Sequence, residues 1–239
     1  MNYIIDQLLS NIISFAVGSI LTYIVANRKD IRTRFKVWRL GNKKIRLSLS
    51  YLFQIKDDGK FLLIHGNRIQ QYQPIGGVYK YYDTFNNIKQ VLEVSDESNE
   101  HFFEEADLRI EAPAKNIMKV LEWFKTRKNR ETTVTREFIE EIIEPGLLDI
   151  EDLKEVRFEY VNTKETGLRY SHYFKMDEYL SYDVYRVTLP EKLMEKLKKN
   201  AASSNKFFWA SQNDIDTENI YIDGQAVKIG EHAKYITTC

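Results

Sequence analysis

The chain has 239 residues, which is enough for one ordinary domain and an appendage. It carries 35 basic and 35 acidic side chains, so its net charge near zero gives no reason to expect a DNA or RNA polymer as partner. The one cysteine, Cys239, is the last residue. An intramolecular disulfide is therefore excluded, and the composition fits a reducing compartment.

The amino-terminal segment from Leu8 to Ala26 contains no charged residue and is about as long as a helix that crosses a hydrocarbon core. Asp6 precedes it and cations follow it, which is the reverse of a secretory signal peptide. We therefore predict a transmembrane helix in residues 1–27, as a single pass through the inner (cell) membrane. The positive-inside rule then places the C-terminal domain in the cytoplasm. A buried core helix is the alternative.

Residues 28–43 are predicted to form a basic juxtamembrane linker or the end of a helix. Nine cations and a single acid, Asp30, fall between residues 28 and 46. Local charge of one sign is typical of contact with a surface or a lipid headgroup. Membrane lipid is therefore an expected partner.

From residue 44 the pattern changes to short strands mixed with helices. Strands are expected at residues 45–55 and 61–68, joined by a turn, and again at 155–163, 167–176 and 182–189. Helices are expected at residues 112–127, 132–143, 190–200 and 223–236, and residues 205–215 read as a strand that runs into a loop. This alternation predicts one α/β (α+β) domain over residues 44–239.

The stretch TREFIEEIIEPGLL, residues 135–148, places several glutamates on one predicted helix face. Glu137 and Glu141 are four residues apart, Glu140 is three from Glu137, and Arg136 is four before Glu140. Spacing alone favours a solvated face. The other interpretation is a magnesium site, because Mg²⁺ takes carboxylate oxygens together with waters and substrate phosphates.

Several stretches together resemble the Nudix hydrolase family. REFIEE, residues 136–141, matches the centre of the family's box, and PGLL, residues 145–148, resembles its close. Upstream, QPIGG, residues 73–77, is similar to the strand and double glycine that open the box, and FFWAS, residues 207–211, is similar to a late strand. The resemblance implies a Nudix-like mixed sheet sandwiched by helices over residues 44–239.

The resemblance also implies roles for individual residues. Glu137, Glu140 and Glu141 would be catalytic and would bind the metal, Mg²⁺, while Arg136 would orient one of them. Nucleotide bases stack on aromatic rings and phosphates bind cations, so a ligand is expected near the glycine turn. The predicted ligand-binding residues are Gly76, Gly77, Tyr72, Tyr79, Arg68 and Trp209. A half-buried core position is the alternative for each tyrosine.

Two departures from the family pattern matter. Between Gly77 and Arg136 lie 58 residues, far more than the family box leaves, so residues from about 83 to 131 form a long insert. The early glutamate of the box has no clear match. Glu131 is the nearest candidate, but its spacing to Arg136 is too short.

A transmembrane helix followed by a divergent Nudix domain resembles the membrane-anchored Nudix effectors (SMODS-associated NUDIX domain) of the bacterial anti-phage system CBASS. That resemblance implies a homo-oligomeric effector that binds a cyclic oligonucleotide second messenger and triggers membrane disruption or cell death. Two other hypotheses remain open. One is a Mg²⁺-dependent hydrolase of a nucleoside diphosphate derivative, with a degenerate box, and the other is a membrane-tethered interaction module.

Overall fold

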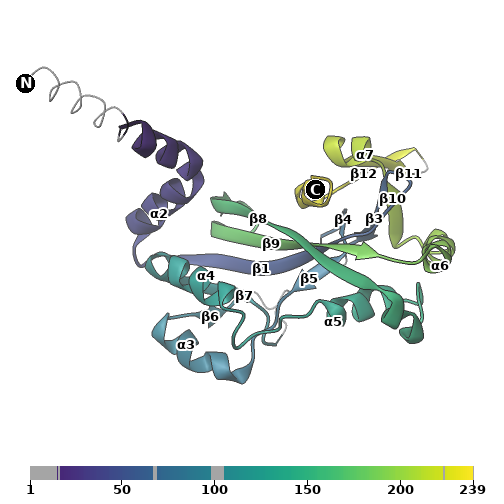
Figure 1. Ribbon diagram of the computed structural model, residues 1–239, viewed down its shortest axis with the longest axis horizontal. Helices are drawn as coiled ribbons and strands as arrows, with labels where there is room; N and C mark the ends of the chain where they lie inside the picture. Colours follow the sequence, from purple (N-terminus) through teal and green to yellow (C-terminus); the bar gives the residue numbers. More distant parts are fainter. Residues whose placement is uncertain (1–14, 16, 67–68, 98–104, 223, 239) are drawn as a thin grey trace, which may run out of the picture.

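The computed structural model describes residues 15, 17–66, 69–97, 105–222 and 224–238. Its centre is a six-stranded mixed sheet in the order β6-β7-β1-β9-β8, with β5 also paired to β1 (Figure 1). Strand β1, Lys44–Gln54, pairs antiparallel with β7 and β5 and parallel with β9. Every residue of β1 after Lys44 is buried, as expected of a strand covered on both faces. The other strands of this sheet are β5 (Gly76–Val78), β6 (Ser95–Asp96), β7 (Arg109–Pro113), β8 (Arg157–Ser171) and β9 (Met176–Thr188).

Two smaller sheets complete the β structure. One has the order β10-β3-β2, with β4 paired to β3, and the other is the hairpin β11–β12. Their strands are β2 (Lys56–Asp57), β3 (Lys60–His65), β4 (Tyr72–Pro74), β10 (Phe207–Ala210), β11 (Asn219–Ile222) and β12 (Gln225–Lys228).

Helices cover both faces of the central sheet. Short 3-10 turns also occur at η1 (Asp83–Phe85), η2 (Ala114–Asn116), η4 (Ile150–Glu155) and η5 (Glu231–Ile236). The α-helices are α2 (Arg28–Leu40), α3 (Asn86–Val91), α4 (Ile117–Lys125), α5 (Thr135–Phe138), α6 (Glu191–Ala202) and α7 (Gln212–Thr217).

Alternation along β1 creates two hydrophobic cores. Tyr51 and Phe53 point into the larger core, which contains the buried side chains of α4 and α5. Leu52 points to the other face and joins a smaller core with residues of α7 and η5. Figure 1 shows α4 and α5 on one side of the long strands and α7 with the C-terminus on the other.

The predicted mixed α/β fold is confirmed, and so are several of its elements. Residues 117–125 and 191–202 are helical, as the apolar periodicity predicts. The strands expected at residues 155–163 and 167–176 merge into one long strand, β8, with irregular pairing near residues 161 and 166. This strand ends at Ser171, and residues 172–175 form a turn before β9. The expected final helix at 223–236 is wrong, because residues 225–228 pair with β11 and only residues 231–236 form helical turns.

The predicted insert contributes to the central sheet. Its strand β7 pairs with β1 from Lys44 to Ser48, and its helix α4 packs into the larger core. The segment therefore belongs to the body of the domain.

The predicted location as a single-pass membrane protein is corrected by the structure. Part of the predicted span falls outside the described residues. Within the residues that are described, no helix is both long and apolar enough to cross a membrane. Residue 15 and residues 17–26 are helical, and the strongly basic helix α2 follows.

Candidate functional site

The glutamate stretch forms one α-helical turn followed by a wider π-helical segment. Helix α5 ends at Phe138, and the π segment η3 runs Ile139–Ile143. Its wider hydrogen bonds run from the Glu144 amide to the Ile139 carbonyl, 2.8 Å, and from the Leu147 amide to the Ile142 carbonyl, 2.9 Å. A π turn adds one residue to the loop that each bond closes, so it changes the direction of the side chains that follow. The three glutamates therefore do not share the single face that an uninterrupted α-helix would give them.

Arg136 is the centre of the site. Its Nη1 lies 2.7 Å from Glu137 Oε1 and 3.1 Å from Glu140 Oε2. Its Nε and Nη2 donate to the two carboxylate oxygens of Glu131, each at 3.2 Å, and Nη2 also donates to the Val78 carbonyl at 2.9 Å. The fork geometry of guanidinium allows this bidentate pairing. Arg136 thus joins the box helix to β5 and to the end of the insert.

The glycine turn packs directly against this centre. A Cβ built on Gly77 would lie 1.9 Å from the carboxyl carbon of Glu137, and one on Gly76 would lie 2.2 Å from the Tyr51 carbonyl oxygen. Neither distance is compatible with a real side chain. The pair of glycines is therefore required for the box helix and β1 to approach β5 so closely.

Burial changes the ionisation of this cluster. Desolvation raises the pKa of Glu137 to about 7, although the neighbouring Arg136 charge lowers it. For Arg136 itself, burial lowers the pKa, but the hydrogen bonds to Glu131 and Glu137 more than offset this and the net shift is upward. Near neutral pH, Glu137 can accordingly exist in either protonation state while Arg136 stays charged.

Glu141 pairs with a cation other than Arg136. Its Oε2 lies 3.4 Å from Lys206 Nζ, just before β10. Across the described parts of the chain, no three Asp, Glu, His or Cys side chains are grouped so that they could hold one metal ion. The carboxylates as they stand do not fit a three-ligand Mg²⁺ site, so Glu137, Glu140 and Glu141 as metal ligands stay a prediction.

Tyr51 is a site residue that sequence patterns do not reveal. Its ring is fully buried next to Tyr79, with ring centroids 4.6 Å apart. Its hydroxyl group has no hydrogen-bond partner among the described residues. Burial, and then the charges of Glu137 and Glu131, raise its pKa. Tyr51 is thus a neutral hydroxyl beside the carboxylate cluster.

A comparison with protein families identifies the fold around this cluster. The model of the SMODS-associated NUDIX domain matches residues 44–237. The chain belongs to this family. No curated protein and no solved structure matches it.

The NUDIX domain keeps the family's Arg-Glu core but builds its surroundings differently from the sequence prediction. Glu131, which spacing alone had made doubtful, accepts from Arg136 through both of its carboxylate oxygens, each at 3.2 Å. Lys206 was also missed, because nothing in the sequence near residue 206 indicates a contact with Glu141. The Lys206–Glu141 contact joins residues that are 65 positions apart in the chain. Glu131 is only five residues from Arg136 but lies before α5 begins, so helical spacing does not predict its contact.

The aromatic residues predicted to bind a ligand are mostly core residues of the NUDIX domain. Tyr72 is buried in the smaller core and its hydroxyl donates to the Asn205 carbonyl at 3.0 Å. Tyr79 is buried beside Tyr51 and its hydroxyl donates to Asp183 Oδ2 at 2.9 Å. Their rings offer no open face for a base. Trp209 is half-buried against the larger core, and Arg68 lies outside the described residues.

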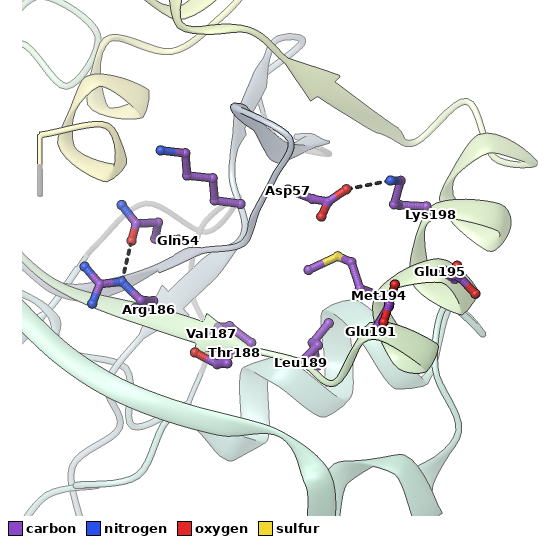
Figure 2. A pocket seen from close by; sticks show the side chains of 11 residues that line it. Gln54, Asp57, Arg186, Val187, Thr188, Leu189, Glu191, Met194, Glu195 and Lys198 are labelled. Carbon is purple, nitrogen blue, oxygen red and sulfur yellow. Dashed lines mark hydrogen bonds and ion pairs between the residues drawn. The ribbon is translucent and has the colours of Figure 1, made fainter.

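A separate cleft of about 570 Å³ lies where β1 and β9 end, beside α6. Figure 2 shows Lys198 of α6 paired with Asp57, 2.5 Å apart, and Arg186 bound to Gln54. Its wall mixes cations and acids, and none of the predicted site residues lines it. The candidate functional site is therefore the Arg136 cluster, and this cleft is not part of it.

Proposed function

We propose that this NUDIX domain is the ligand-sensing part of an anti-phage effector and that it binds a cyclic nucleotide second messenger beside the box helix. Membership of the SMODS-associated NUDIX family supports this proposal. The observation that carries it is the pairing of Glu137 and Glu141 with Arg136 and Lys206, respectively. A box in which these two carboxylates already have cation partners suits binding better than metal-dependent hydrolysis.

Lys206 is the cation best placed to meet a phosphate. Its side chain keeps 34% of its surface exposed, and its contact with Glu141 spans 3.4 Å. An exposed ion pair of this kind contributes little, about 0–1 kcal/mol, so a phosphate oxygen can replace the glutamate at low cost. Arg136, by contrast, is fully engaged with carboxylates and a carbonyl and serves to hold the site together.

The test is the melting temperature of the full chain with cyclic dinucleotides and cyclic trinucleotides. A ligand at one hundred times its dissociation constant stabilises the folded state by about 2.7 kcal/mol, which a thermal scan detects easily. We expect a rise with at least one ligand, reduced in Lys206→Met and kept in the matched control Lys199→Met, an exposed lysine of α6. A flat response to every cyclic nucleotide contradicts the proposal.

Hydrolysis of a nucleoside diphosphate derivative is the second candidate function. It is favoured by one observation, the pKa of about 7 for the buried Glu137 carboxyl, which suits a general base near neutral pH. Cleavage into a nucleoside monophosphate and a second phosphorylated product in the presence of Mg²⁺ would be lost in Glu137→Gln and kept in Glu144→Gln, an exposed glutamate of the same segment. Equal hydrolysis rates in the two variants would show that Glu137 is not required for the activity.

A further inference from the structure

The outer face of α2 exposes an unusual row of large apolar side chains. Ile31, Phe35 and Trp38 are 40%, 60% and 75% exposed. They are spaced four and three residues apart, so they lie on one stripe of the helix. The rings of Phe35 and Trp38 touch, with centroids 5.9 Å apart. We call these three side chains the α2 ridge.

The opposite face of α2 is already occupied by the domain. Val37 is buried in the larger core and Leu40 packs against it. Lys36 Nζ donates to the Leu168 carbonyl of β8 at 3.0 Å. The helix is therefore fixed on the domain with its ridge turned away from the body, and Figure 1 shows α2 at the edge of the molecule.

Arginines border the ridge on both sides. On a helix of 3.6 residues per turn, Arg28, Arg32 and Arg39 fall on one flank of the ridge and Arg34 on the other. All four are exposed. None of them takes part in an ion pair with a described residue. The surface thus combines aromatic and aliphatic side chains with exposed positive charge.

We propose that the α2 ridge and its bordering arginines dock the domain on an anionic lipid surface. A helix with Trp and Phe on one stripe and arginines beside it lies in the headgroup plane, where apolar side chains enter the acyl boundary and cations meet lipid phosphates. This docking uses surface side chains and needs no segment to cross the bilayer.

The experiment is sedimentation of the full chain with phosphatidylcholine vesicles, with and without phosphatidylglycerol. We expect binding to require the anionic lipid and to weaken as salt shortens the range of the charges. The double variant Phe35→Ala/Trp38→Ala should bind at least about tenfold more weakly, since two large apolar side chains no longer enter the lipid. Arg32→Glu/Arg39→Glu should lose the preference for anionic vesicles.

Two control variants match these changes elsewhere on the surface. Tyr221→Ala removes an aromatic side chain that is 77% exposed, and Lys228→Glu reverses an exposed charge. Both should sediment with vesicles like the natural chain. If the α2 variants also do so, or if the natural chain ignores anionic lipid, the docking proposal is wrong.

A local readout distinguishes lipid contact from self-association. Trp38 is exposed, whereas Trp123 is buried and Trp209 half-buried, so an emission shift on adding vesicles reports Trp38. The shift should disappear in Trp38→Phe while sedimentation remains. If the α2 variants change only the oligomeric state measured by light scattering, a second copy of the chain covers the ridge and lipid docking is excluded.

Discussion

Glu137 is the residue whose environment most affects the chemistry of the site. Its carboxylate lies between the Arg136 guanidinium and the backbone of Gly77, shielded from water. A buried carboxylate stays charged only when its partner compensates for the lost hydration. Here burial outweighs the arginine, so the pKa rises to about 7.

This shift predicts a pH dependence of stability. The folded-state pKa lies above the unfolded value of 4.5, so the folded chain binds more protons between these values. The stabilisation is complete below about pH 4.5 and is lost as the pH rises through 7. The free energy of unfolding of Glu137→Gln, measured with urea, should therefore rise relative to that of the natural chain between pH 5 and 8, by up to about 3 kcal/mol. A constant difference across this range would contradict the assigned shift.

Gly77 supplies a second prediction at the same position. Gly77→Ala forces its methyl group onto the Glu137 carboxyl group, which Arg136 prevents from moving freely. We expect a loss of about 1–3 kcal/mol of stability from this overpacking, measured by chemical denaturation. The same substitution in a Glu137→Ala background should cost clearly less, because the clashing atoms are gone. Equal costs in both backgrounds would show that the contact is not responsible.

At the level of elements, a buried ion cluster joins the strands around β1. Arg46 binds Glu97 through Nε at 3.0 Å and Glu178 of β9 through Nη1 at 3.2 Å. Its guanidinium also lies 4.0 Å from the Phe174 ring centroid. All three charged side chains are almost completely shielded from water. The cluster therefore connects β1 to β9 and to the segment beside β6.

Removing this arginine should strongly destabilise the domain. Arg46→Met leaves the buried Glu97 without this cation and Glu178 with Arg169 alone, and such a loss costs about 3–5 kcal/mol. Lys44→Met is the matched control, since Lys44 forms a more exposed pair with Glu111 and should cost less than about 1 kcal/mol. The measurement is the urea midpoint of each variant, and similar midpoints for both would disprove the role of the cluster.

At the level of the whole molecule, the central sheet separates two cores. Ile142 lies in the larger core beside the box segment, and Ile236 lies in the smaller core near the C-terminus. Both are fully buried. Because the sheet lies between them, a substitution in one core should not alter the stability cost of a substitution in the other.

A double-mutant cycle tests this independence. Ile142→Val and Ile236→Val should each cost about 0.5–1.5 kcal/mol, and the double variant should cost their sum within about 0.5 kcal/mol. Calorimetry or urea unfolding of the four proteins provides the comparison. Strong coupling would mean that the two faces relax together and that the layers are not separate packing units.

Local patterns in the sequence determined several elements of the fold and the location of the site. Alternation predicted β1, apolar spacing predicted α4 and α6, and the Arg-Glu pattern at residues 136–141 identified the box. Each of these depends on contacts within a few residues or on one repeating period. The same local reading placed Arg136 within reach of Glu140, as the structure has it.

Only the tertiary structure decided which groups surround the box. Glu131 reaches Arg136 because the insert returns beside β5, and Lys206 reaches Glu141 from the segment just before β10. A π turn contains Glu140 and Glu141, and sheet packing buries Tyr72 and Tyr79, which the sequence suggested as ligand contacts. These outcomes depend on long-range packing and on which strand edges are covered, and no periodicity within one segment carries that information.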